Sequence, residues 1–178
     1  MQHRDIPDGQ RHEPKGISTA TEGQVYVANG NGSGSWQDRE IIAYGQLTAE
    51  NKEYTISTGG TYVNVDGLAE GLATNVTLNA AAGTLTTSIT AIYELSMNAV
   101  VASNVNQVRD ITFRFLVNNV AGSRTITTTS LESGEKLHVG GKQFVSLESG
   151  DVLNIQITAE AAMAITVSGM DLTLKRVE

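Results

Sequence analysis

Between residues 76 and 177 the sequence repeatedly alternates apolar and polar residues in short runs. In a β-strand successive side chains point to opposite faces, so each such run predicts a strand with one buried face and one wet face. Residues that favour turns separate the runs at the spacing of an antiparallel sandwich. The alternation is clearest at residues 93–101, 111–117 and 153–157, and the predicted turns lie at residues 118–119, 133–134, 140–141 and 149–151. This segment is therefore expected to be all-β.

The final run changes parity, which constrains the last strand. Apolar residues occupy odd positions up to Val167 and even positions from Met170 onward. An extra residue in one strand, a β-bulge, restores the facing, and we expect it at Gly169. The Thr-rich run at residues 125–130 suits an edge strand or an outward-facing strand. Residues 41–48 suit the first strand of the domain, and residues 67–73 predict one weak helical turn.

Residues 1–40 differ in composition from the rest of the chain. Both prolines and two of the three histidines lie here, and residues 29–35 are a Gly-, Asn- and Ser-rich run that disfavours regular structure. Within this segment residues 25–28 form a minimal strand. So little apolar surface cannot offset the entropy of ordering the segment. We therefore expect an extended arm and linker over residues 1–40, disordered or ordered by a partner, and a β domain over residues 41–178.

Composition excludes several classes of function. The chain has 12 Lys and Arg against 19 Asp and Glu, a net charge of −7, with no basic cluster, so a nucleic-acid partner is not expected. It has no cysteine, which removes disulfides and thiolate metal sites and fits assembly in a reducing cytoplasm. No apolar run reaches the length of a transmembrane helix and no signal peptide is recognisable, so a membrane partner is not expected either.

No group of residues has the spacing of a catalytic or metal site. A nucleophile elbow on a strand-to-helix turn is missing, and Gly140-Gly141-Lys142 lacks the pattern of a phosphate loop, so we expect a hairpin turn there. His138 is the only histidine of the β domain and is expected to be exposed. The acidic and histidine residues match neither zinc nor calcium spacing, namely His3, Asp5, His12, Glu13, Asp66, Glu70 and Asp151. We expect no enzyme activity, no cofactor and no structural metal.

Five short pieces, in order along the chain, resemble the jelly-roll domains of the complement and tumour-necrosis-factor superfamily. They are residues 83–86 (Gly-Thr-Leu-Thr), 92–96 (Ile-Tyr-Glu-Leu-Ser), 117–119 (Val-Asn-Asn), 145–153 (Val-Ser-Leu-Glu-Ser-Gly-Asp-Val-Leu) and 168–172 (Ser-Gly-Met-Asp-Leu). Ala91 stands where the family usually has glycine. The resemblance, which covers residues 74–176, implies an antiparallel jelly-roll sandwich that assembles as a homotrimer. It also implies that one sheet edge is buried with aromatic or aliphatic side chains around the threefold axis, and that the domain binds partners without catalysing a reaction.

The leader resembles the N-terminal segments of tailed-bacteriophage head-fibre, decoration and tail-fibre proteins, on residues 12–17, 23–30 and 32–36. The resemblance implies a virion structural protein, assembled in the host cytoplasm and carried on the outer capsid surface as a trimeric decoration or head-fibre protein. Its partner would be the phage major capsid protein, which the arm would bind by strand addition around residues 25–28. The expected contact residues are His12, Glu13, Pro14, Lys15, Gly16, Ile17, Val25, Tyr26, Val27 and Trp36.

Two other functions are weighed against this one. A tail-fibre protein would recognise a host surface glycan, but an aromatic content of 5% provides few rings for sugar stacking. An enzyme of the bacterial surface would need catalytic residues that the sequence does not arrange. For Trp36, the only tryptophan, two interpretations stay open: it packs on a partner or on the base of the trimer, or it caps the sandwich of its own chain.

Overall fold

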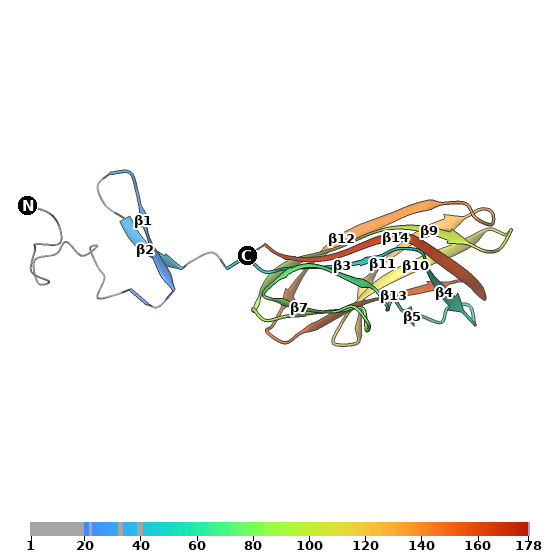
Figure 1. Ribbon diagram of the computed structural model, residues 1–178, viewed down its shortest axis with the longest axis horizontal. Helices are drawn as coiled ribbons and strands as arrows, with labels where there is room; N and C mark the ends of the chain where they lie inside the picture. The colour runs from blue at the N-terminus through green and yellow to red at the C-terminus, as the bar shows by residue number, and fades with distance from the viewer. Residues whose placement is uncertain (1–19, 22, 32–33, 39–40, 178) are drawn as a thin grey trace, which may run out of the picture. The chain divides into compact units, whose positions relative to one another are not determined.

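The computed structural model describes residues 20–177 except 22, 32–33 and 39–40 (Figure 1). The chain divides into two compact units, Met1–Ile41 and Ile42–Glu178. Every regular element in the described part of the chain is a β-strand. The predicted fold class, an all-β antiparallel jelly-roll sandwich, is confirmed for the second unit, whose strands form two antiparallel sheets.

The first unit contains one two-stranded antiparallel sheet, made of β1 (Gln24–Ala28) and β2 (Gly34–Asp38). The second unit contains two six-stranded sheets. Their strands are β3 (Tyr44–Ala49), β4 (Lys52–Ile56), β5 (Val63–Asn64), β6 (Ala69–Thr74), β7 (Val76–Asn79), β8 (Thr84–Thr87), β9 (Ala91–Ser103), β10 (Arg109–Val117), β11 (Val120–Ser130), β12 (Leu137–Leu147), β13 (Val152–Ala159) and β14 (Met163–Arg176).

The two sheets of the second unit are named here after their central strands. The β10–β13 sheet has the order β11-β10-β13-β8-β7, with β5 added on β13, and the β9–β14 sheet has the order β12-β9-β14-β3-β6, with β4 added on β14. All the pairings are antiparallel, and most neighbours in a sheet are not neighbours in sequence. The chain therefore crosses repeatedly between the two layers, which is the connectivity of a jelly roll.

The core lies between the inner faces of the sheets, as the alternation predicts. On β9 the buried side chains are Tyr93, Leu95, Met97, Ala99 and Val101, each exposed by 5% or less. On β10 and β13 the predicted positions are buried in the same way except Val117, which is only partly buried, while its neighbour Leu116 is buried instead. Each large apolar side chain that is fully buried stabilises the fold by roughly 1.5–3 kcal/mol. The period-two pattern is thus the main determinant of which face each strand buries.

The bulge expected at Gly169 is confirmed. Val167 is paired with Val101 of β9 while Gly169 is already paired with Val100, so the register shifts between them. Because of this shift both halves of β14 face the core, and Ile165 and Met170 are each at most 5% exposed. The Thr-rich run also lies as expected, because β11 is an edge strand of the β10–β13 sheet.

Three of the four predicted turns are confirmed. Asn118 and Asn119 both have positive φ, 50° and 65°, which is the backbone that a two-residue hairpin between twisted strands requires. Gly134 and Gly150 likewise have positive φ at the other two turns. The turn expected at residues 140–141 is wrong, because both glycines lie inside β12 and are paired with Asn98 and Met97 of β9.

Tertiary packing explains the two glycines inside β12. A Cβ on Gly141 would lie 2.8 Å from Cδ1 of Ile126, which belongs to β11 of the other sheet. Glycine therefore permits the edges of the two sheets to approach each other closely. The helical turn expected at residues 67–73 is also wrong. This segment forms β6, because its backbone pairs with β3 from Tyr44 to Thr48, and that long-range pairing overrides a weak local preference.

The entry to the domain differs from expectation in its details. The first strand, β3, begins at Tyr44, and a turn at Asn51, whose φ is 50°, leads into β4. β4 pairs with the first half of β14, from Met163 to Val167, while β3 pairs with the second half. The long strand β14 thus pairs with two short strands, β3 and β4. The segment that enters the domain and the segment that leaves it lie side by side, and Arg176 N donates a hydrogen bond to Ala43 O there.

Candidate functional site

The β1–β2 hairpin brings together four of the residues predicted to bind a partner. Val25, Tyr26 and Val27 lie on β1 and Trp36 lies on β2. Tyr26 and Trp36 are directly opposite in the register, and their rings meet edge to face with centroids 5.4 Å apart. Such an aromatic pair stabilises a sheet by about 0.5–1.5 kcal/mol beyond its buried area. The contact thus favours a hairpin where sequence reasoning predicted a single minimal strand.

Glycine is necessary where the aromatic rings cover the hairpin. A Cβ on Gly34 would clash with the backbone oxygen of Val27 and would lie 2.8 Å from the ring of Tyr26, so only glycine fits at this position of the second strand. Gly30, with φ of 78°, helps to reverse the chain between the strands. The Gly- and Ser-rich run therefore does not prevent regular structure in this segment, because Gly34 and Ser35 begin β2.

The two faces of the hairpin are unlike. On one face the Trp36 indole packs on Tyr26, and its Nε1 is buried without an acceptor in the described structure. On the other face Val25 and Val27 are 43% and 41% exposed, opposite Gln37 and Ser35. A lone two-stranded hairpin is marginally stable in water. The valine face is thus an apolar surface that the described residues leave open.

The remaining six predicted contact residues lie outside the described residues, namely His12, Glu13, Pro14, Lys15, Gly16 and Ile17. Trp36 packs on Tyr26 of the same hairpin, a neighbour that neither of the two interpretations named. Whether it also contacts a partner stays a prediction.

A second candidate surface lies on the outward face of the β9–β14 sheet. Phe144 on β12 is 62% exposed, Ile92 on β9 is 38% exposed, and Val177 and Ile42 flank β14 and β3. Val177 N donates a hydrogen bond to Ile92 O, and Phe144 is paired with Glu94, two residues along β9 from Ile92. These four residues, the apolar patch, extend across four strands at the end of the sandwich where β3 begins. Sequence reasoning missed them, although Ile92 and Phe144 are apolar residues at outward positions.

Beyond the apolar patch, polar side chains on this face bond to each other across the strands. Lys142 Nζ donates to Glu94 at 3.1 Å, and Gln46 Nε2 donates to Asp171. The hydroxyls of Ser96 and Thr173 also share a hydrogen bond. Removing water from polar groups that are already hydrogen-bonded costs less free energy than removing it from unpaired polar groups. The face therefore combines apolar surface with polar groups that already have partners.

A shallow pocket lies where the edge strands β11 and β12 meet. It is lined by Ser123, Arg124, Lys142, Gln143 and Phe144. The Lys142 ammonium lies 6.0 Å from the centre of the Phe144 ring, at the limit of a cation–π contact. An aromatic ring, two cations and an amide are groups that bind a sugar ring or an acidic group. This pocket and the apolar patch share Phe144.

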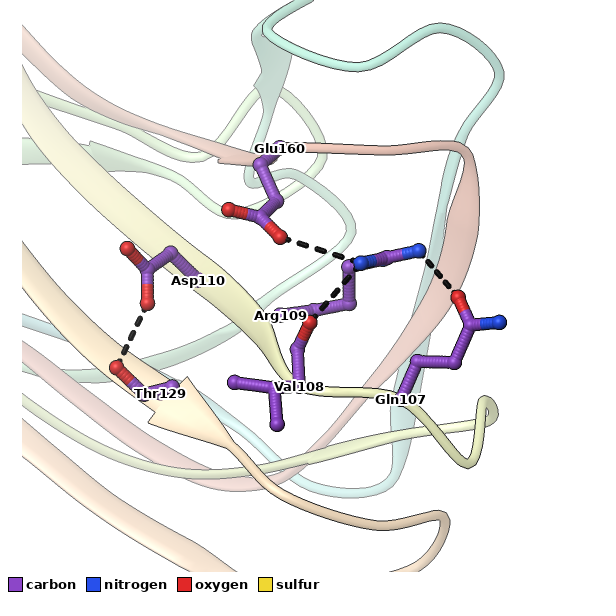
Figure 2. Close-up of polar contacts among 6 residues, drawn as sticks. All are labelled: Gln107, Val108, Arg109, Asp110, Thr129 and Glu160. Carbon is purple, nitrogen blue, oxygen red and sulfur yellow. Dashed lines mark hydrogen bonds and ion pairs between the residues drawn. The ribbon is translucent and has the colours of Figure 1, made fainter.

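The opposite end of the sandwich carries a paired polar cluster (Figure 2). The Arg109 guanidinium donates to Glu160 Oε1 at 3.3 Å, to Val108 O and to Gln107, while Thr129 donates to Asp110 at 2.6 Å. Asp110 O also accepts from Glu160 N, so the start of β10 is tied to the turn after β13. Since every charged group shown has a partner, this cluster holds loops in place.

The turn before β13 is held by an acid from the piece at residues 145–153. Asn118 Nδ2 donates to one oxygen of Asp151 at 2.8 Å, and Glu148 N donates to the other at 2.8 Å. Val152 N donates in turn to Asn118 Oδ1. The bond from Asn118, followed by the bond from the Glu148 backbone, lowers the pKa of Asp151. Asp151 thus links two turns.

No group of three or more His, Asp and Glu side chains in the described ranges lies close enough to hold a metal ion. His138 is exposed on β12, as expected.

Burial, helped by the nearby Asp66, raises the pKa of Tyr54 to about 12, and the Tyr54 hydroxyl donates a hydrogen bond to Asp66 O. Within the same ranges the structure has no helix long and apolar enough to cross a membrane.

Comparisons with known proteins agree with the fold of the second unit. No protein-family model matches the chain, and no curated protein matches it in sequence. Solved structures do match: Eiger TNF from S. frugiperda at 10% identity and a TM-score of 0.54, covering 78% of this chain and 94% of that one. Murine APRIL, solved at pH 5.0, matches at 14% identity and a TM-score of 0.54, covering 76% of this chain and 99% of that one.

The globular domain of zebrafish complement 1qA matches with a TM-score of 0.49 at 12% identity, covering 74% of this chain and 94% of that one. At such identities a likeness shows the fold alone. The two structures that match with a TM-score of 0.54 establish a jelly roll of the tumour-necrosis-factor type, which confirms the fold that the sequence pieces implied.

Proposed function

We propose that this protein is a virion structural protein of a tailed bacteriophage. Three copies would form a decoration or head-fibre protein on the outer capsid surface, held to the major capsid protein by their N-terminal arms. The observation that carries the proposal is a separate unit with an open apolar hairpin face, joined to a jelly roll of a type that binds partners. The resemblance of the leader to phage proteins supplies the capsid as the partner.

The apolar patch supports the trimer. Phe144 lies on β12, an edge strand, whereas Ile92, Val177 and Ile42 lie toward the middle of the same face. In a ring, one edge of each copy contacts a different surface of the next copy, and closure after three copies satisfies all the edges. Phe144 would then pack on the face of the neighbouring copy, where the polar groups already have partners. That the ring contains three copies is what the resemblance to the trimeric jelly-roll family implies.

The hairpin supports attachment through the arm. Its aromatic face is closed by Tyr26 and Trp36, so the valine face is the one available to the capsid. Ser35 and Gln37 flank the valines and carry no charge, which fits an apolar surface bordered by hydrogen-bonding groups. A single hairpin is small, but three arms on one trimer act together through their effective concentration. Residues 12–17 would add contacts beyond the hairpin.

Deletion of residues 1–38 tests the proposal. The shortened chain should keep the β-rich circular dichroism spectrum and should still assemble as a trimer, because the second unit has its own core. It should no longer bind capsids that lack the wild-type protein. A shortened chain that coats such capsids at wild-type occupancy would disprove attachment through the arm.

A disulfide across the hairpin tests how the arm binds. Val27 and Ser35 are directly opposite in the register, and the natural chain has no cysteine, so Val27→Cys with Ser35→Cys creates one defined crosslink. If the hairpin docks as a preformed unit, the oxidised and reduced forms should bind capsids alike. If β1 must leave β2 to pair with the capsid, oxidation should abolish binding and reduction should restore it.

A second candidate function is glycan recognition by a tail fibre, which the pocket at β11 and β12 favours. Arg124 gives this pocket positive charge on a chain whose net charge is −7, while Lys142 is already paired with Glu94, so the ligand would be an acidic saccharide stacked on Phe144. Arg124→Ala separates the two functions. It should abolish binding to acidic saccharides on a glycan array if the pocket is a receptor site, and should leave capsid binding unchanged if the arm carries attachment.

A further inference from the structure

We propose that Asn29, in the connection between β1 and β2, is a site of spontaneous backbone modification that yields isoaspartate. Asn29 is followed by Gly30, and both are exposed. In the whole sequence only Asn29 and Asn31 precede a glycine. The inference concerns the chemistry of the hairpin itself and does not depend on the proposed function.

The reaction needs only the peptide and water. The Gly30 backbone nitrogen attacks Cγ of Asn29, a C–N bond forms, and the Cγ–Nδ2 bond breaks, which releases the side-chain nitrogen as ammonia. The product is a five-membered succinimide. Water then opens the ring at one of its two carbonyls, which gives either aspartate or isoaspartate. A following residue with a side chain hinders the attack, whereas glycine leaves the nitrogen accessible.

The hydrogen bonds of the loop favour this step at Asn29. Asn31 N donates to Asn29 Oδ1 at 3.0 Å, so the side chain folds back along the two residues that follow it in an Asx turn. The bond restricts the rotation of the side chain and withdraws electron density from Cγ. Gly30 has a φ of 78°, and apart from its two chain neighbours no residue places an atom within 4 Å of where its Cβ would lie. The attacking nitrogen therefore has little steric protection.

Two asparagines in a turn of the jelly roll lack the following glycine. Asn118 and Asn119 also have positive φ, but Asn119 and Val120 follow them. The Asn118 amide is held at both ends, because Nδ2 donates to Asp151 and Oδ1 accepts from Val152 N. These two residues provide internal controls that share the backbone conformation of a turn without the following glycine.

Modification would change the arm in two ways. It would add one negative charge to a connection whose described residues are uncharged, and isoaspartate would lengthen the main chain by one methylene group between the strands. Both changes fall at the end of the hairpin, beside Val27 and Ala28. The charge and geometry of the arm would therefore change as the protein ages.

The test is to age the purified full-length protein at mildly alkaline pH, with a sample at mildly acidic pH as control. Isoaspartate is measured by labelling with an isoaspartyl methyltransferase, and is located by fragmentation of the tryptic peptide that spans residues 16–39. We expect label at position 29 and ammonia release in the alkaline sample, and loss of the label at this position in Asn29→Gln, whose longer side chain does not readily close the five-membered ring.

The folded state of Asn29→Gln is checked by its fluorescence and circular dichroism spectra, so that a loss of label reports on chemistry. Three results would overturn the proposal: no isoaspartate in the alkaline sample, label at Asn31 without label at Asn29, or equal label at Asn118 and Asn119.

Discussion

At the scale of single residues, Asp151 shows how a short sequence piece acts in the folded protein. Its two carboxylate oxygens accept hydrogen bonds from Asn118 and from the Glu148 backbone, and so join the turn after β10 to the turn before β13. Both bonds favour the ionised acid, and they lower its pKa although the group is exposed. Ionisation of Asp151 is therefore coupled to folding.

The sign of this coupling gives a pH prediction. Because the pKa of Asp151 is lower in the folded than in the unfolded protein, its contribution to stability is present above the unfolded pKa, roughly pH 4, and is lost as the pH falls through the folded value. Wild type should therefore melt at a higher temperature than Asp151→Asn at neutral pH, with the difference shrinking in acid. Thermal melts across this range measure it, with Glu132→Gln as the exposed control. A difference that stays constant into acid would contradict the prediction.

At the scale of elements, the glycines of β12 show that tertiary contacts decide whether a glycine pair forms a turn or lies inside a strand. Gly141 lies inside a strand because Ile126 of the other sheet occupies the space where its side chain would be. The same pattern of adjacent glycines in sequence favours a turn. Contact between β11 and β12, which belong to different sheets, decides between these two structures. Similarly, β6 is a strand because β3 provides its hydrogen-bond partners.

The close contact between Gly141 and Ile126 predicts a coupled pair of mutations. Gly141→Val should destabilise the domain by about 1–3 kcal/mol, because it overpacks the space against Ile126. Ile126→Ala should recover part of that loss, since it removes the atoms that clash. Urea unfolding of the two single variants and the double variant measures the coupling. Additive effects would mean that the two residues do not meet.

The hairpin predicts a separate, local transition. Trp36 is the only tryptophan, so its fluorescence reports on the hairpin without interference from the jelly roll. Tyr26→Ala should shift its emission to longer wavelength, because the ring that covers the indole is removed. Circular dichroism of the domain should melt at an unchanged temperature. The control Tyr62→Ala, which changes a tyrosine stacked on Arg114 in the second unit, should leave the emission unchanged. Unchanged emission in Tyr26→Ala would contradict the ring contact.

At the scale of the whole molecule, the outward faces of the two sheets differ. The β9–β14 sheet exposes the apolar patch, whereas most exposed positions of β10 and β11 carry polar residues such as Thr112 and Thr127, whose hydroxyls are hydrogen-bonded, with Val120 at the start of β11 as an apolar exception. Apolar surface spread over four strands indicates a place of contact, while a polar face suits water. The asymmetry is therefore consistent with one face turned toward other copies and one toward solvent.

The trimer proposal predicts the outcome of one substitution on each face. Phe144→Asp should convert the trimer to monomers, because it places a charge where an aromatic side chain would be buried. Removing a buried aromatic side chain of this kind from an interface costs about 2 kcal/mol or more of binding free energy. Thr127→Asp on the opposite sheet should leave the trimer intact. Sedimentation or light scattering measures the mass of each. Wild type that is a stable monomer at micromolar concentration would refute the trimer.

Much of the fold could be predicted from the sequence because its causes are local. Alternation over β9, β10 and β13 follows from the period-two geometry of a strand, and the change of parity at Gly169 is enough to predict the bulge. The turn at Asn118 and Asn119 follows from residues that tolerate positive φ. In each case the residues whose pattern predicts the strand or turn are the same residues that form it, so the prediction needs no information from elsewhere in the chain.

The rest was decided by contacts between residues far apart in the sequence. Val25, Tyr26, Val27 and Trp36 were predicted as contact residues, but only the pairing of β1 with β2 shows that Tyr26 and Trp36 cover one face and leave the valines open. Ile92 and Phe144 become part of one apolar surface because β12 pairs with β9 in a particular register. Gly141 becomes a strand residue because Ile126 packs on it. Such pairings depend on the free energy of the assembled sheets, which cannot be inferred from any short segment of the sequence alone.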